Sequence, residues 1–295
     1  MSKRTRLPTH RLLQRRMAGF TLIEAIMVIV ITGIVASIVA VFIRSPVQGY
    51  IDSVRRAELT DQADVALRRM SRDVRLALPN SLRVTTSAAN VTYIEFIMTS
   101  DGGRYRDPSD GSTAGDFLSF SSAADLTFDV HGVMPAIAAN DFIVIYNLGP
   151  GYAPANAYVA ADPCAACNRA KVSSVAGNVV TLASNPFAGQ TPPLPSPNGR
   201  FQVVPGGTKA VTYSCPTAVA GAGNLTRFWN YGFSAAQPTA PGGTSALLAS
   251  GNATCAVQYT PAATGRVGLL NVQLTLTSNG ESVTLSQQVH VDNSP

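Results

Sequence analysis

The most constraining feature of this sequence is an apolar run close to its amino terminus. Residues 20–43 form a stretch of 24 residues with one ionisable side chain, Glu24. As an α-helix this stretch would be about 36 Å long, enough to cross a bilayer core of about 30 Å. The residues before it carry six basic side chains and no acidic one: Lys3, Arg4, Arg6, Arg11, Arg15 and Arg16. Because basic flanks stay in the cytoplasm, the sequence predicts one membrane-spanning helix with the rest of the chain on the outer side.

The order of basic leader and apolar run separates this segment from an ordinary secretory signal. In such a signal, small residues follow the apolar region and mark the cleavage site. Here the small residues Ala18 and Gly19 precede it, so cleavage after Gly19 would leave the apolar helix on the mature chain. Glu24 is also unusual, since a carboxylate within a membrane helix has either a partner or a function, or else reaches the headgroups at the membrane edge.

Residues 17–24, Met-Ala-Gly-Phe-Thr-Leu-Ile-Glu, and the apolar helix after them resemble the processing signal of type IV pilins and type II secretion pseudopilins. The resemblance implies that a prepilin peptidase cuts after Gly19 and that the new amino terminus, Phe20, is methylated. It also implies that Glu24 pairs with the terminal amine of a neighbouring subunit during assembly. The physics agrees with this role, because an ammonium and a carboxylate attract strongly in a low-dielectric layer.

The same resemblance implies where the protein resides and what it contacts. The expected location is the bacterial inner membrane, crossed once between Phe20 and Ile43 with the head in the periplasm, and afterwards a pilus or pseudopilus. The expected partners are other pilin subunits, met through the amino-terminal helix, together with the prepilin peptidase and an assembly platform.

A second and less specific resemblance covers residues 17–84. It is to minor pilin-like proteins of the mannose-sensitive haemagglutinin (MSHA) pilus system, and it rests on residues 46–50, 55–59, 66–70, 72–73 and 76–81. Secretion pseudopilins and other minor pilins share this architecture. We therefore expect a structural subunit, not an enzyme, that takes part in the assembly or initiation of an MSHA-type pilus. The alternatives are a type II secretion pseudopilin and an adhesin displayed at a pilus tip.

Residues 44–79 are expected to continue the helix as an amphipathic half, after a leader at 1–19 and a membrane-spanning half at 20–43. Pro46 and Gly49 predict a kink or a short melted stretch, and Pro79 with Asn80 predicts the end of the helix. Apolar residues recur at three- and four-residue steps, and we expect this stripe to pack against the chain's own head. The stripe consists of Leu59, Ala63, Ala66, Leu67, Met70, Val74, Ala77 and Leu78.

Residues 80–295 predict a β-rich antiparallel head, which makes the expected fold class α+β and pilin-like. Two alternating apolar runs flank residues 278–281, and the Asn-Gly pair between them predicts a closing hairpin, because both turn positions need positive φ. Residues 101–115 and 189–199 are expected to be long loops. The other expected strands are residues 91–98, 117–120, 126–130, 142–148, 179–182, 201–204 and 210–213.

Four cysteines, Cys164, Cys167, Cys215 and Cys255, lie on the outer side of the predicted span, where disulfides form. Four cysteines allow three pairings, and we expect Cys164–Cys167 and Cys215–Cys255. Disulfide-bounded loops near the carboxyl terminus are also what the pilin resemblance implies. Two alternatives remain for the close pair. A zinc site would need two more ligands, and a redox pair usually begins a helix in a βαβ unit.

The charge pattern argues against nucleic-acid binding. The net charge of +5 becomes −1 when the six basic side chains of the leader are removed, so the head has no overall basic character. A short basic cluster remains, and it is interleaved with Asp61, Asp64 and Asp73, which predicts a solvated helix face. The cluster consists of Arg68, Arg69, Arg72 and Arg75.

No recognisable catalytic motif occurs, and we expect no cofactor and no metal site. The three histidines, His10, His131 and His290, have no such motif around them. The acidic turns at 101–103 and 107–111 lack the glutamate that closes an EF-hand loop. The enzymatic alternative is a membrane-tethered thiol oxidoreductase that uses Cys164 and Cys167.

Overall fold

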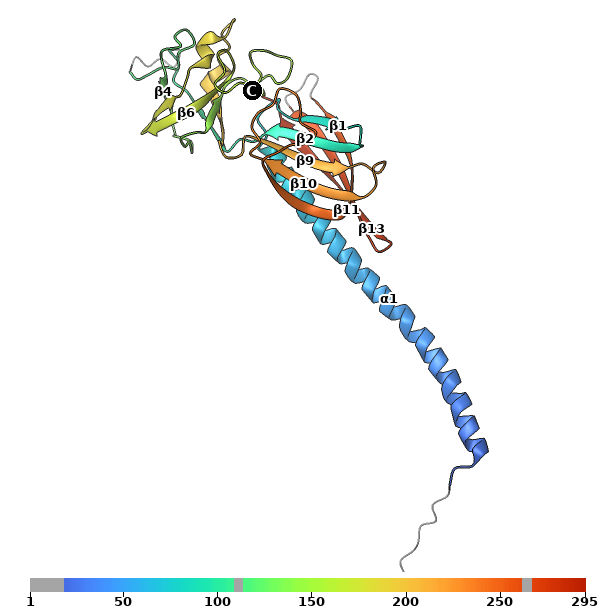
Figure 1. Ribbon diagram of the computed structural model, residues 1–295. Coiled ribbons are helices and arrows are strands. Elements are labelled where there is room, and N and C mark those ends of the chain that lie inside the picture. Colours follow the sequence, from blue (N-terminus) through green and yellow to red (C-terminus); the bar gives the residue numbers. More distant parts are fainter. Residues whose placement is uncertain (1–18, 109–113, 262–266) are drawn as a thin grey trace, which may run out of the picture. The chain divides into compact units, whose positions relative to one another are not determined.

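The computed structural model describes residues 19–108, 114–261 and 267–295. The predicted basic leader lies outside this range apart from Gly19, and so does most of the acidic turn at 107–111. The chain divides into two compact units, Met1–Val54 and Arg55–Pro295. The architecture is one long amino-terminal helix followed by curled antiparallel sheets (Figure 1), so the predicted α+β, pilin-like fold class is confirmed.

Helix α1 runs from Leu22 to Arg75 and is continuous through Pro46 and Gly49. The predicted melted stretch is therefore wrong, because a proline removes one helical hydrogen bond and the long helical segments on both sides retain theirs. The helix ends before Pro79. Ala77 forms an isolated antiparallel bridge with Met98, so the chain has left the helix before it reaches Pro79.

The apolar stripe of α1 packs against the head, as predicted. Ala63, Ala66 and Met70 are almost fully buried among side chains of the larger sheet. The other members are also buried, and Leu78 belongs to a separate cluster between the two sheets. Because the stripe faces one way and the arginines face another, only one side of this part of the helix enters the core.

The larger sheet has seven antiparallel strands in the order β1-β2-β9-β10-β11-β12-β13. Figure 1 shows it curling beside the carboxyl-terminal part of α1. Strands β12 and β13 form the predicted hairpin, with φ of 50° at Asn279 and 86° at Gly280, which confirms the Asn-Gly turn. The strand bounds are β1 Arg83–Thr86, β2 Val91–Ile97, β9 Ala210–Pro216, β10 Gly223–Trp229, β11 Thr244–Thr260, β12 Val267–Ser278 and β13 Glu281–Asp292.

The smaller sheet has six antiparallel strands in the order β3-β8-β5-β6-β7-β4 and its own core, which includes Phe128, Phe187 and Phe201. Two short 3-10 helices, η2 Pro186–Gly189 and η3 Pro197–Gly199, lie in the connection between β7 and β8. The strand bounds are β3 Asp101–Arg104, β4 Thr127–Asp129, β5 Phe142–Val144, β6 Arg169–Ala176, β7 Val179–Leu182 and β8 Arg200–Val204.

One strand prediction and one loop prediction are wrong in the smaller sheet. Residues 117–120 form no strand, because Leu118 and Phe120 fill the second core from an irregular segment. The predicted loop at 101–115 begins as strand β3, which pairs with β8. Five strands were not predicted, namely β1, β3, β6, β10 and β11, since polar and small residues interrupt their alternation.

Candidate functional site

The candidate site is the start of α1, and its first feature is an accessible peptide bond. Gly19 and Phe20 precede the helix and are both exposed. No other part of the described chain comes within 4 Å of a Cβ built on Gly19. A protease that must bind an extended substrate therefore meets the Gly19–Phe20 bond outside regular structure, directly before a helix.

Thr21 caps the helix, a role that the sequence analysis missed. Its hydroxyl accepts a hydrogen bond from the Glu24 N–H at 3.3 Å, and its carbonyl accepts one from the Ala25 N–H at 3.1 Å. The spacing Thr-x-x-Glu is that of a capping box, which would have given the signal. Glu24 thus occupies the first helical turn, where a carboxylate interacts favourably with the helix dipole.

Glu24 differs from the other polar side chains of the apolar half. The hydroxyl of Thr32 donates to the Val28 carbonyl at 2.6 Å, and the hydroxyl of Ser37 donates to the Ile34 carbonyl at 2.7 Å. These groups are satisfied within the helix, as a membrane requires. The carboxylate of Glu24 is the one ionisable side chain in residues 20–43, so it is the group here that gains most from a cationic partner.

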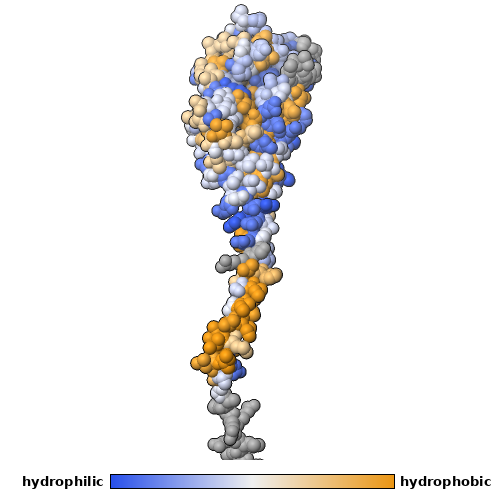
Figure 2. Space-filling view, turned by 90° about the vertical axis from the view of Figure 1, so that its right-hand side faces the viewer, coloured by the Kyte–Doolittle hydropathy of each residue, from blue (hydrophilic) through white to orange (hydrophobic). Residues whose placement is uncertain are grey.

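Within the described part of its own unit, the apolar half of α1 packs against no partner surface. A segment of 18 residues in this helix has a mean hydropathy of 3.0, and none of it is buried. The helix is therefore long and apolar enough to cross a membrane. Figure 2 shows the apolar side chains gathered along this half. Leu22 and Phe42 are 80% and 76% exposed. A surface of this kind needs lipid or other apolar helices around it.

The comparisons with known proteins agree with this geometry. The family described as the prokaryotic N-terminal methylation motif matches residues 14–40, a segment that includes Gly19, Phe20 and Glu24. The chain therefore carries the amino-terminal motif of type IV pilin-like proteins. No curated protein and no solved structure matches it significantly.

Both expected disulfides are present in the head. Cys215 on β9 and Cys255 on β11 are joined, with their Cα atoms 5.8 Å apart, and Cys164 is joined to Cys167. No described cysteine is free. Cys164 and Cys167 are both buried, at 7% and 0% exposed, whereas a reactive redox cysteine is partly exposed.

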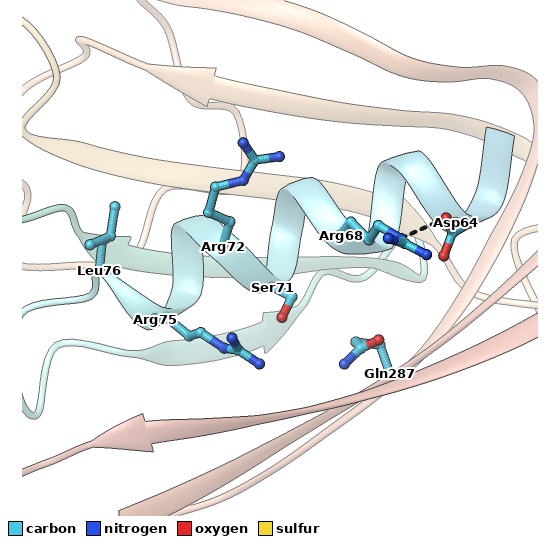
Figure 3. A pocket seen from close by; sticks show the side chains of 7 residues that line it. All are labelled: Asp64, Arg68, Ser71, Arg72, Arg75, Leu76 and Gln287. Atoms are coloured by element: carbon cyan, nitrogen blue, oxygen red, sulfur yellow. Dashed lines mark ion pairs between the residues drawn. The ribbon is translucent and has the colours of Figure 1, made fainter. Parts of the chain in front are cut away.

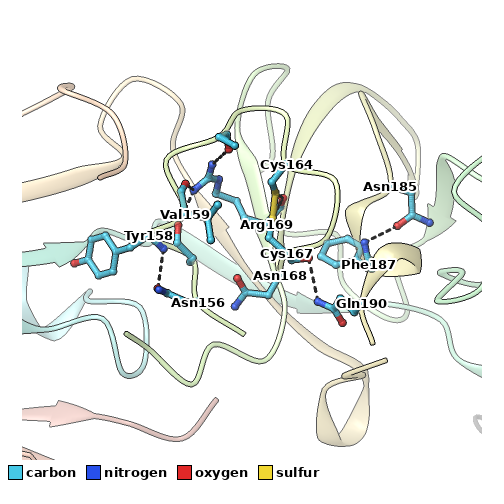
Figure 4. Close-up of a disulfide and its surroundings, with 12 residues drawn as sticks. Asn156, Tyr158, Val159, Cys164, Cys167, Asn168, Arg169, Asn185, Phe187 and Gln190 are labelled. Carbon is cyan, nitrogen blue, oxygen red and sulfur yellow. Dashed lines mark hydrogen bonds between the residues drawn. A yellow bond between two sulfur atoms is a disulfide. The ribbon is translucent and has the colours of Figure 1, made fainter. Parts of the chain in front are cut away.

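A buried arginine organises the loop that carries Cys164 and Cys167 (Figure 4). Arg169 donates hydrogen bonds to the carbonyls of residues 157, 159 and 161 at 2.6 to 2.8 Å. Its guanidinium also stacks on the ring of Phe233, 3.8 Å from the ring centroid. Burial lowers the pKa of Arg169 to about 10. Since these acceptors are all main-chain groups, this arginine holds the loop in place.

The remaining predicted features do not gather into a site. His131 and His290 are both exposed and lie apart in the chain's topology, since His290 is on β13 of the larger sheet and His131 lies in the segment after β4 of the smaller sheet. Asp101 accepts hydrogen bonds from the Ala136 and Gly102 N–H groups, and these bonds lower its pKa. Its carboxylate is therefore engaged with backbone groups of the head. Among the described residues there is no group of three or more His, Cys, Asp or Glu side chains able to hold a metal ion.

Proposed function

We propose that this protein is a minor pilin-like subunit made as a prepilin. The prepilin peptidase cuts between Gly19 and Phe20, and the amine of Phe20 is then methylated. The observation that carries the proposal is the methylation motif at residues 14–40 placed on an exposed bond before a long apolar helix. Before assembly the chain resides in the inner membrane with its head in the periplasm, and it is then incorporated into a filament.

In this proposal Glu24 supplies register between subunits. Its carboxylate pairs with the amino terminus of a neighbouring subunit, because both charges lose their hydration in the apolar layer and offset each other only when aligned. The exposed apolar side chains of the helix support this role, since they suit both storage in lipid and packing with other pilin helices.

The particular system is the finer part of the proposal. The resemblance of residues 17–84 favours a minor pilin-like protein of the MSHA pilus, of the MshO type, acting in assembly or initiation. A type II secretion pseudopilin has the same architecture and remains the alternative. A deletion strain separates the two, because loss of surface pili supports the first and loss of exoprotein release supports the second.

The test of processing is the mass of the chain made together with a prepilin peptidase. We expect a mature product that starts at Phe20 and carries one added methyl group. Gly19→Leu should accumulate at the precursor mass, because a bulky side chain blocks the residue before the cut. Gly33→Leu is the matched control, since open space surrounds Gly33, and it should be processed normally. A normal mature mass for Gly19→Leu would falsify the cleavage assignment.

A further inference from the structure

Strand β13 is an unusually long sheet edge. It runs from Glu281 to Asp292 and all 12 of its residues pair with β12. Within the described chain no strand pairs with its other side. The other sheet edges are short, at four residues in β1, four in β3 and three in β4. Natural proteins keep edges short because unpaired backbone groups recruit other strands.

The register shows which backbone groups of β13 are free. Ser278 and Glu281 flank the two-residue turn, so their backbones exchange two hydrogen bonds with each other. Along an antiparallel ladder, hydrogen-bonded pairs of this kind alternate with non-hydrogen-bonded pairs. Thr275 and Thr284 form a non-hydrogen-bonded pair of the backbone ladder, and their hydroxyl oxygens lie 2.8 Å apart. The residues that turn their N–H and C=O groups to the open edge are Ser282, Thr284, Ser286, Gln288 and His290. One of these groups is not free, because the Gln288 carbonyl accepts a hydrogen bond from Gln287 Nε2 at 3.1 Å.

This edge lacks the devices that normally block strand addition. Residues 282–291 contain no lysine, arginine or proline, and the pairing with β12 has no register shift. The side chains that accompany the free backbone groups are uncharged apart from His290, and all are exposed. An edge that is long, regular and unprotected is suited to pairing with another strand.

A basic groove of about 610 Å³ lies between this edge and helix α1 (Figure 3). In the figure, Ser71 and Arg75 point toward Gln287 of β13. Arg68 is paired with Asp64 at 2.6 Å. Across the described residues, no ion pair involves Arg72 or Arg75. The groove is lined by Asp64, Arg68, Ser71, Arg72, Arg75, Leu76 and Gln287.

We propose that β13 binds an extended segment of another polypeptide as an added antiparallel or parallel strand, with acidic side chains facing α1. Such a strand would satisfy the free backbone groups of residues 282–290 and place its carboxylates beside Arg72 and Arg75. A second copy of β13 fits poorly, because its two carboxylates, Glu281 and Asp292, lie only at the ends of the strand and two arginine grooves would repel each other. The inference goes beyond pilin processing and does not depend on it.

The test uses the full chain in an uncharged detergent and a fluorescent peptide of about eight residues that alternates valine and glutamate. Binding is measured by fluorescence anisotropy. We expect it to be about tenfold tighter than binding of the same peptide with lysine for glutamate, and to weaken as salt rises. Methylating alternate backbone nitrogens of the glutamate peptide should abolish binding, because it removes the hydrogen bonds of the added strand.

Protein variants locate the site. Arg72→Gln with Arg75→Gln should weaken binding of the glutamate peptide by about tenfold. Arg69→Gln, an exposed arginine of the same helix that does not line the groove, should leave it unchanged. Ser286→Pro should abolish binding, because it removes a free edge N–H without removing a donor from the β12 ladder, whereas Ser286→Ala should bind normally.

Three results would overturn the inference. One is equal affinity for the glutamate and lysine peptides. Another is undiminished binding of the backbone-methylated peptide, which needs no protein variant and so does not depend on the folding of Ser286→Pro. The third is sedimentation of the full chain as a dimer that Ser286→Pro disrupts and Ser286→Ala preserves, which would assign the edge to a second copy.

Discussion

Asp73 on helix α1 and Arg227 on strand β10 form a buried ion pair, with 2.7 Å between Arg227 Nε and Asp73 Oδ2. The Tyr213 hydroxyl donates to the same carboxylate oxygen at 2.7 Å. The pair joins the helix to the middle of the larger sheet, where both residues are buried. The amphipathic half of α1 is therefore attached to the head by a specific polar contact as well as by its apolar stripe.

Asp73→Ala should lower the free energy of unfolding by about 3 to 5 kcal/mol, because it leaves the Arg227 charge buried without its partner. Denaturant unfolding followed by the fluorescence of Trp229 measures this directly, since Trp229 is the only tryptophan and the Arg227 guanidinium lies 4.7 Å from its ring. Asp64→Ala, which breaks the exposed pair with Arg68, is the control and should leave the midpoint unchanged. Equal effects of the two changes would contradict the importance of burial.

The two disulfides should differ in their contribution to stability. Replacing Cys215 and Cys255 by alanine should lower the free energy of unfolding by about 4 kcal/mol, because that bond closes a loop of 40 residues. Replacing Cys164 and Cys167 should cost less than half as much, since only 3 positions separate them. Denaturant titration without reductant gives both values. A larger loss for the short loop would mean that local packing, not loop closure, dominates.

Glu95 should make stability depend on pH. It is buried beside Arg83, with 2.6 Å between Arg83 Nε and Glu95 Oε2, and Tyr231 donates to its other oxygen at 2.9 Å. Burial raises the pKa of Glu95 above its ordinary value of 4.5, and Arg83 opposes the shift. A raised folded-state pKa means that the folded protein binds the proton more readily than the unfolded chain.

The contribution of Glu95 to stability is therefore fully present below pH 4.5 and is lost as pH rises through the folded-state pKa. We expect the stability of the original chain, relative to Glu95→Gln, to increase as pH falls from 7 toward 4.5. Denaturant unfolding of both proteins across this range provides the measurement. A difference that shrinks on acidification would show that the ion pair with Arg83 outweighs desolvation.

Glu24 has two proposed roles that substitutions separate. Its position in the first turn favours the helix start, and glutamine fills that position of a capping box as well as glutamate does. Pairing with a neighbouring amine needs the charge. Glu24→Ala and Glu24→Gln should therefore both be processed normally and both be depleted from sheared filaments. Normal incorporation of Glu24→Gln together with depletion of Glu24→Ala would reduce Glu24 to a helix-start residue.

Local patterns were sufficient to predict the parts of this protein that depend on a few neighbouring residues. The apolar run at 20–43, the stripe that includes Ala63 and Met70, and the Asn279–Gly280 turn each follow from side-chain periodicity or backbone φ within a short window. The amino-terminal methylation motif at residues 14–40 belongs to this class, because its residues are contiguous in the sequence. Thr21 could have been predicted as the cap from its spacing to Glu24.

Only the tertiary structure determined the rest. Strand β11 runs through Gly251 with φ of 67°, and it is a strand because β10 and β12 pair with it, not because its own residues alternate. Asp73 and Arg227 lie 154 positions apart, so nothing local indicates that their charges meet. The groove beside β13 likewise exists because packing brings the arginines of α1 next to an edge that is last in the sheet. Such long-range contacts depend on how the whole chain buries its apolar surface, which short segments of sequence do not encode.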